Sequence, residues 1–190
     1  MKKKIMKIKE MLRYFLLREG KHKTHKNEYG CLMIYLDFKK EDWDKIQDLI
    51  DDEDLYTVKN DPTYGRENEP HVTILYGFHE DIPYDELETE ILKIKKPRLS
   101  IKDVSSFNNE FDVLKFDIES PSLHKLNDKF RKFPHTNRYT DYHPHVTIAY
   151  LKKGKAKKYI DKIKKLGDMK IKPEKIVYSG VDDTKKEYDF

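Results

Sequence analysis

The chain contains one seven-residue stretch twice, and this duplication limits what it can fold into. The first copy runs from Pro70 to Tyr76 as PHVTILY, and the second runs from Pro144 to Tyr150 as PHVTIAY. Six of the seven positions are identical, and the copies lie 74 residues apart. Because β-branched and aromatic residues follow each histidine, each copy predicts a β-strand. Repetition over such a distance indicates an internal repeat, with one motif strand in each half of the domain.

The order of residue types within each copy predicts a polar face. Side chains alternate between the two faces of a strand, so His71 shares a face with Thr73, and His145 shares one with Thr147. The pKa of an imidazole lies near neutrality, so its environment can make one ring a base and the other an acid. Hydroxyl groups donate hydrogen bonds to phosphate oxygens. Two such strands, brought together, predict phosphodiester chemistry that needs no metal and no cofactor, with these four residues as the catalytic ones.

Composition restricts the other function classes. A chain of 190 residues suffices for one sizeable domain or for two small lobes that share a core. The single cysteine, Cys31, excludes an internal disulfide framework and a thiolate zinc cluster, and it suits the reducing cytoplasm, where we expect the protein. No apolar stretch has the length of a membrane span. The chain also lacks a glycine-rich phosphate loop, which argues against a nucleoside-triphosphate enzyme.

Charge is distributed unevenly along the chain. Residues 1–28 hold 10 Lys and Arg against 3 Asp and Glu, a net charge of +7, whereas residues 29–190 carry −3. Apolar residues in the basic segment recur at helical spacing, which predicts an amphipathic N-terminal arm that packs on the domain, lies on a membrane, or contacts nucleic acid or protein. The body lacks the basic footprint of a protein that binds long polyanions. A small nucleotide is therefore the expected substrate.

Hydrophobic periodicity and turn residues predict the remaining elements. The acidic run Asp51–Asp54 is expected to be a solvated helix end rather than a metal site. The expected order is a strand at 31–38, a helix at 41–50, the first motif, a helix near 83–94, strands at 99–107 and 111–118, a helix at 121–130, the second motif, a helix at 155–166, and strands at 171–178 and 187–190. This order predicts an α+β fold of two pseudo-symmetric antiparallel-sheet lobes, with helices outside and the motif strands meeting in a central cleft. Residues 29–190 then form a single bilobal domain.

Several side chains beside the motifs are candidates for contacting substrate. Tyrosines offer faces for stacking on nucleobases, and an arginine offers charge to a phosphate, although loop residues often have neither role. A further histidine beside the second motif either tunes the catalytic ring or touches the substrate. The candidates are Tyr64, Arg66, Tyr76, Tyr142, His143 and Tyr150.

The two motifs resemble the signature of the 2H phosphoesterase superfamily, which carries two His-x-Thr/Ser motifs on strands of a bilobal fold. His71 with Thr73 and His145 with Thr147 match it, and the layout agrees over roughly residues 30–190. The superfamily includes 2′-5′ RNA ligases and cyclic phosphodiesterases. Residues 139–147, YTDYHPHVT, further resemble a phage branch, the anti-CBASS nucleases that destroy cyclic oligonucleotide immune messengers. This likeness implies an enzyme acting in the host cytoplasm, and the basic arm falls outside it.

Three activities are compatible with these observations. The first is two-histidine hydrolysis of a ribonucleotide phosphodiester, either a cyclic oligonucleotide or an RNA end such as a 2′,3′-cyclic phosphate, with the acid and base roles unassigned. The second is a non-catalytic module that sequesters a cyclic nucleotide. The third is a metal hydrolase that uses His71, His143 and His145, although no nearby acid completes a ligand pattern.

Overall fold

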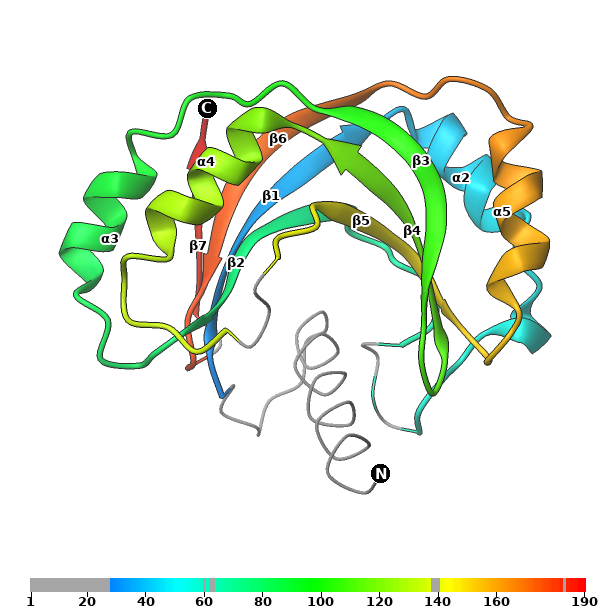
Figure 1. Ribbon diagram of the computed structural model, residues 1–190, viewed down its shortest axis with the longest axis horizontal. Coiled ribbons are helices and arrows are strands. Elements are labelled where there is room, and N and C mark those ends of the chain that lie inside the picture. Colours follow the sequence, from blue (N-terminus) through cyan, green and yellow to red (C-terminus); the bar gives the residue numbers. More distant parts are fainter. Residues whose placement is uncertain (1–27, 60, 62–63, 138–140, 183) are drawn as a thin grey trace.

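The computed structural model describes residues 28–190 except 60, 62–63, 138–140 and 183, so the predicted N-terminal arm lies outside the described residues apart from residue 28. Two antiparallel sheets form an arch (Figure 1). The four-stranded sheet has the order β2-β1-β6-β7 and the three-stranded sheet the order β3-β4-β5. The strands are β1 (Gly30–Phe38), β2 (His71–Phe78), β3 (Ser100–Asn108), β4 (Asp112–Glu119), β5 (His145–Leu151), β6 (Ile171–Ser179) and β7 (Lys185–Asp189). The predicted α+β class is confirmed.

Helices cover the outside of the arch (Figure 1). They are α2 (Lys40–Asp48), the 3₁₀ turn η1 (Asp52–Asp54), α3 (Tyr84–Ile91), α4 (Pro121–Phe130) and α5 (Ala156–Lys164). The start of α4 follows local chemistry, since Ser120 Oγ accepts a hydrogen bond from the Leu123 amide at 3.3 Å and Pro121 occupies the first helical turn. One continuous apolar core lies between the helices and both sheets, so the two halves share it.

The two halves also exchange their connections. The loop that leads into β2 lies along β5, where the Glu67 amide donates to the Ile148 carbonyl at 3.0 Å. The loop that leads into β5 lies along β2 in the same manner, with the Thr136 amide donating to the Gly77 carbonyl at 2.8 Å. Gly77 has a φ of +114°, and a Cβ atom there would lie 2.2 Å from the Thr136 carbonyl oxygen. Glycine at this position therefore permits the close approach of the loop.

In the acidic run Asp51–Asp54, the first three residues are exposed, as predicted, and only Asp54 departs from the predicted solvated helix end. Asp54 is only 2% exposed, and its carboxylate accepts hydrogen bonds from the Tyr159 hydroxyl at 2.6 Å and from Lys158 Nζ at 3.1 Å. Lys155 Nζ lies 2.8 Å from its other oxygen. These contacts tie η1 to α5. The sequence conceals this role because all three partners lie about a hundred residues away along the chain.

We expect the Asp54→Asn variant to lose about 1–3 kcal/mol of unfolding free energy at neutral pH. Hydrogen bonds from Lys155, Tyr159 and Lys158 hold the pKa of the Asp54 carboxyl well below its usual range. A lowered folded-state pKa stabilises the fold above the unfolded-state pKa, near 3.8, and this contribution disappears as the pH falls further. Urea titrations between neutral and acidic pH should therefore show a steeper loss for the natural protein. Parallel curves would contradict this role.

Candidate active site

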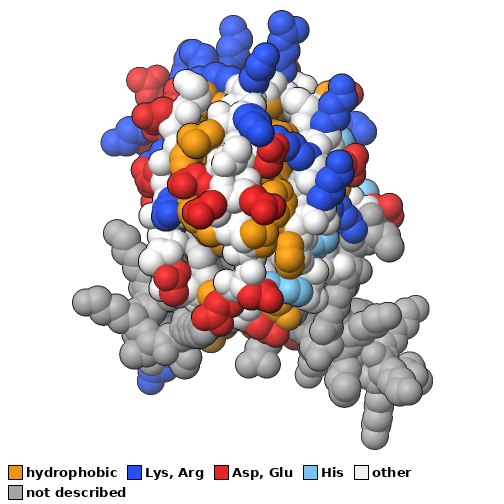
Figure 2. All heavy atoms as spheres, turned by 90° about the vertical axis from the view of Figure 1, so that its left-hand side faces the viewer, with side chains coloured by type: hydrophobic (Ala, Val, Ile, Leu, Met, Phe, Trp, Pro, Cys, Tyr) orange, Lys and Arg blue, Asp and Glu red, His pale blue; other side chains and the backbone are white. Residues whose placement is uncertain are grey.

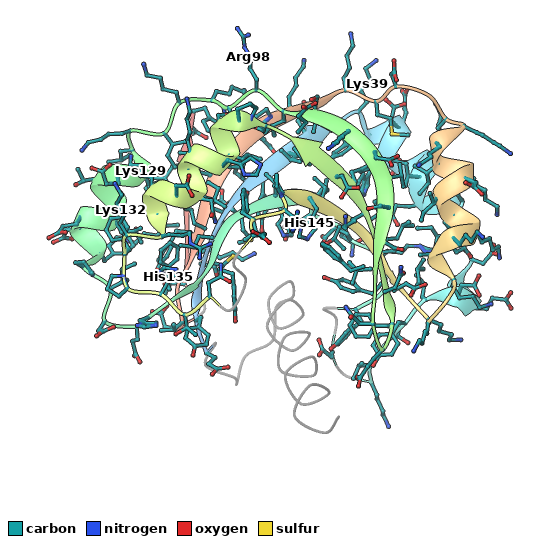
Figure 3. All side chains as sticks on the ribbon, viewed as in Figure 1. Lys39, Arg98, Lys129, Lys132, His135 and His145 are labelled. Atoms are coloured by element: carbon teal, nitrogen blue, oxygen red, sulfur yellow. The ribbon has the colours of Figure 1, made fainter. Side chains whose placement is uncertain are left out.

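The two motif strands form the adjoining edges of the two sheets. β2 is an edge strand of the four-stranded sheet, β5 is an edge strand of the three-stranded sheet, and the two strands lie against each other (Figure 1). The structure thus brings together two segments that are 74 residues apart in the sequence. Figure 3 shows His145 on β5 between the two sheets. This contact between edges is the juxtaposition that the repeated motif predicts.

Both motif histidines are oriented by the same local bond. His71 Nδ1 lies 2.8 Å from the Glu69 carbonyl oxygen, and His145 Nδ1 lies 2.8 Å from the His143 carbonyl oxygen. A carbonyl oxygen only accepts hydrogen bonds, so Nδ1 carries the hydrogen in each ring. In a neutral ring Nε2 is then the basic nitrogen, and in a protonated ring Nε2 is a donor. Each ring therefore presents the same atom for proton transfer.

The proline before each histidine accounts for this orientation. Proline restricts the residue that precedes it to extended conformations, which directs the carbonyl group of that residue toward the histidine two positions later. The two prolines are also held alike, because the Leu36 amide donates to the Pro70 carbonyl and the Ile118 amide donates to the Pro144 carbonyl, both at 2.9 Å. His143, a predicted substrate contact, thus has a defined role through its backbone, while its side chain is exposed.

A bulge in each motif strand moves a tyrosine onto the face of the histidine. In β2 the pairing with β1 shifts between Thr73 and Leu75, which leaves one extra residue, Ile74. In β5 the pairing with β4 shifts in the same way around Ile148. Strict alternation would place the tyrosine five positions after each histidine on the apolar face. The bulges instead place Tyr76 and Tyr150 on the faces of the histidines, where Tyr76 is partly exposed and Tyr150 is only 3% exposed.

The extra residue of each bulge accepts a hydrogen bond from an amide side chain. That side chain belongs to a helix that follows, in the sequence, a strand of the other sheet. Asn127 on α4 is buried, and its Nδ2 donates to the Ile74 carbonyl at 2.7 Å. Gln47 on α2 donates from Nε2 to the Ile148 carbonyl at 3.1 Å. α4 follows β4 but packs on β2, so this contact joins the two halves. These two amides went unrecognised in the sequence because nothing near them in the chain identifies their acceptors.

We expect Asn127→Asp to lower the unfolding free energy by about 1–3 kcal/mol at neutral pH, because an ionised carboxylate cannot donate to the Ile74 carbonyl. Burial raises the pKa of an introduced carboxyl, and the protonated form can donate. The penalty should therefore shrink as the pH falls below that raised pKa. Urea titrations against pH test this, with Asn109→Asp in the exposed β3–β4 turn as the control. An equal penalty at every pH would show that the bond to the carbonyl contributes little.

The two motifs differ in how they are buried. His71 and Thr147 are each 7% exposed, whereas Thr73 and His145 are partly exposed. Each histidine also packs against one aromatic ring: Tyr35 lies 5.8 Å from His71, and Phe107 lies 5.1 Å from His145, between ring centroids. Each motif therefore presents one sheltered and one open polar group. Both histidines lie on strand faces opposite to those of Val72 and Val146, which belong to the apolar core.

The other predicted substrate contacts are Tyr64, Tyr142 and Arg66, and each has a different surrounding. Tyr64 lies beside Tyr150, with ring centroids 5.7 Å apart, in an aromatic cluster. Tyr142 donates from its hydroxyl to the Thr73 carbonyl at 2.7 Å, and burial raises the pKa of its phenol, so it links the second motif to the first strand as a neutral donor. Arg66 points elsewhere, because its guanidinium donates to the Ile50 carbonyl at 2.6 Å and lies 2.7 Å from Asp52. The structure does not bring Arg66 to the histidines.

The structure places a charged pair beside the second motif that the sequence analysis did not predict. Lys115 and Asp117 on β4 pair directly with Thr147 and His145 on β5, so all four side chains share one face. The alternation of polar and apolar residues along 112–119 predicts a strand with one polar face. It does not predict the register between β4 and β5, which places Lys115 and Asp117 beside the motif. In residues 28–190, apart from the undescribed gaps, no three His, Cys, Asp or Glu side chains are grouped to hold a metal ion.

Comparisons with known proteins agree with this geometry. A family profile described as the 2′-5′ RNA ligase superfamily matches residues 37–177. A solved structure of Usb1 from Kluyveromyces marxianus is similar with a TM-score of 0.52 at 10% identity, covering 87% of this chain and 99% of that chain. A second Usb1 structure, with uridine monophosphate, has a TM-score of 0.53 at 12% identity with the same coverage. A search of curated proteins finds no match.

The fold, the paired motifs and the profile match, which spans well over half of the chain, lead to one assignment. The solved structures share the fold alone at this level of identity, and the profile supplies the family. No helix of the described residues is long and apolar enough to cross a membrane. The chain belongs to the 2′-5′ RNA ligase superfamily, and it is a phosphodiesterase of the 2H phosphoesterase type.

Proposed function

We propose that this enzyme cleaves a ribonucleotide phosphodiester by acid–base catalysis between His71 and His145. The observation that carries this proposal is the matched orientation of the two rings, each with Nδ1 held 2.8 Å from a backbone carbonyl, on adjoining strands. One neutral ring accepts a proton at Nε2 from the attacking hydroxyl, either a ribose 2′-OH or water. The oxygen–phosphorus bond forms as the bond to the leaving oxygen breaks. The other ring, protonated, donates its Nε2 hydrogen to that leaving oxygen.

The threonines stabilise the charge that develops on phosphorus. Thr73 and Thr147 share the faces of the histidines, and their hydroxyls donate to non-bridging phosphate oxygens as negative charge gathers there. Tyr76, which is partly exposed, stacks against a nucleobase beside the phosphate, while Tyr150 is only 3% exposed and supports this face from within its aromatic cluster. Proton transfer and charge stabilisation both come from side chains in this mechanism, so it needs no cofactor.

A small substrate fits the charge of the body better than a long RNA. Residues 29–190 carry a net charge of −3. Figure 2 shows one face on which Lys and Arg gather at the upper end while acidic and apolar side chains cover the middle. We propose a cyclic oligonucleotide as the substrate, in line with the resemblance of residues 139–147 to phage anti-CBASS nucleases, and host cytoplasm as the location. The second candidate is a 2′,3′-cyclic phosphate or 2′-5′ linkage at an RNA end, favoured by the similar structure that contains uridine monophosphate.

A panel of substrates tests the proposed function. Cyclic di- and trinucleotides, 2′,3′-cyclic mononucleotides and 2′-5′ linked dinucleotides are incubated with the full chain, with and without EDTA, and products are separated by chromatography. We expect cleavage of at least one class, unaffected by EDTA, with a bell-shaped dependence of kcat on pH. Loss of cleavage in EDTA would favour a metal hydrolase, and tight binding without product would favour sequestration.

A further inference from the structure

The two halves of the site differ at one pair of positions. On β1, Met33 pairs with Thr73 and Tyr35 pairs with His71. On β4, Lys115 pairs with Thr147 and Asp117 pairs with His145. The pairing is otherwise alike, down to the bulge that follows each threonine. The half with the second motif therefore carries an ion pair where the other half carries an apolar side chain and an aromatic ring.

Lys115 is buried in a position where burial is costly. It is 4% exposed, its Nζ donates to Ser105 Oγ at 2.8 Å, and it forms an ion pair with Asp117. Removing an ammonium group from water costs several kcal/mol, and apolar residues of similar size often support a fold equally well. Met33 shows that this fold accommodates an apolar residue at the equivalent position. The energetic cost of Lys115 thus calls for a reason other than packing.

Lys115 and His145 contact the same aromatic ring. Lys115 Nζ lies 4.3 Å from the centroid of the Phe107 ring, and the His145 ring centroid lies 5.1 Å from the same centroid. Phe107 is itself partly exposed. Because charges sheltered from water are weakly screened, an ammonium at this position acts strongly on a phosphate held at Thr147 and His145.

We propose that Lys115 is a phosphate-binding residue of the active site, an assignment that rests on the proposed phosphodiesterase function. Without substrate, the Asp117 carboxylate neutralises the Lys115 ammonium, which also donates a hydrogen bond to Ser105 Oγ. When substrate binds, a phosphate oxygen can take the place of Ser105 Oγ as the acceptor. The phosphate brings the second negative charge that the ammonium attracts. Lys115 then holds the phosphate against the half with the second motif. In the other half, the Tyr35 ring beside His71 contacts Lys175 and Lys185, whose Nζ atoms lie 5.6 Å and 5.8 Å from its centroid.

The double variant K115M/D117N tests this assignment without leaving an unpaired carboxylate. It introduces the methionine that the other half already contains and keeps the net charge unchanged. We expect kcat/KM to fall about 100-fold, the size of effect seen when a donor to developing negative charge is lost. Binding of inorganic phosphate to the full chain, measured by calorimetry, should weaken in parallel. The control is K45M/D42N, which removes a surface ion pair within α2, with 3.8 Å between Lys45 Nζ and the Asp42 carboxylate, keeps the net charge unchanged and should change neither quantity.

The possible outcomes separate this inference from the proposed function. Natural kcat/KM and phosphate affinity in folded K115M/D117N, with folding checked by thermal unfolding, would overturn the role of Lys115 while leaving the function intact. A natural protein that cleaves no diester but binds phosphate through Lys115 would overturn the function and support this inference. A natural protein that neither cleaves diesters nor binds phosphate would overturn both. Should K115M/D117N fail to fold, K115Q/D117N replaces it, since it removes both charges but keeps a polar side chain at each position: weakened phosphate binding in K115Q/D117N supports the role, and unchanged binding overturns it.

Discussion

Alanine in place of His71 or His145 is expected to lower kcat about 10³-fold, because each variant lacks one of the two proton-transfer groups. The remaining histidine still titrates, so each variant should lose one limb of the bell-shaped pH profile. Rates of product formation from pH 5 to pH 9, on the substrate that the panel identifies, measure both effects. The carbonyl groups that orient the rings belong to the backbone, so neither variant disturbs them.

The chain provides a matched control for these variants. Phe133-Pro134-His135 repeats the local arrangement of the motifs, and His135 Nδ1 lies 2.8 Å from the Phe133 carbonyl oxygen. His135, however, lies on the loop after α4, away from His145 (Figure 3). We expect His135→Ala to retain the natural kcat. Full activity in His71→Ala or His145→Ala would refute two-histidine catalysis, whereas an equal loss in all three variants would indicate damage to the fold.

Valine in place of Thr73 or Thr147 should reduce kcat/KM by about 10²-fold, since it removes one donor to the phosphate oxygens while keeping the shape of the side chain. Serine retains the hydroxyl, so Thr73→Ser and Thr147→Ser should recover most of the loss. Steady-state kinetics of the four variants, with thermal unfolding to confirm folding, test this expectation. Thr89→Val on α3 is the control, because that hydroxyl bonds only to the Asp85 carbonyl within its own helix, at 2.8 Å.

The serine variants distinguish the role of the threonine hydroxyl from that of its methyl group. If serine and valine variants were equally impaired, the methyl group of threonine rather than its hydroxyl would matter, and the threonines would be packing residues. If valine variants kept natural kcat/KM, phosphate stabilisation would have to come from other groups, with Lys115 the first to consider. The partly exposed Thr73 and the buried Thr147 make these outcomes informative separately.

Much of the fold follows from local patterns in the sequence. The strands, the helix that begins after Ser120 and the polar face of each motif all appear where the residue types predict them. Within the acidic run Asp51–Asp54, the prediction of solvated residues was wrong for Asp54 alone, because its partners lie on a helix about a hundred residues later. Arg66 shows the same limit, since its bonds to Ile50 and Asp52 depend on how its loop packs rather than on its neighbours in sequence.

The sequence by itself determined the orientation of the histidines, because proline and the two-residue spacing set the bond from Nδ1 to a carbonyl oxygen locally. His135 has that bond and lies outside the site, so local geometry did not decide which histidines form the site. Only the tertiary structure decided that, by making β2 and β5 adjoining edges, by fixing their bulges through Asn127 and Gln47, and by setting Lys115 opposite Thr147. The physical reason is range: backbone restrictions act over a few residues, whereas pairing between distant strands depends on long-range contacts and on a core shared by both halves.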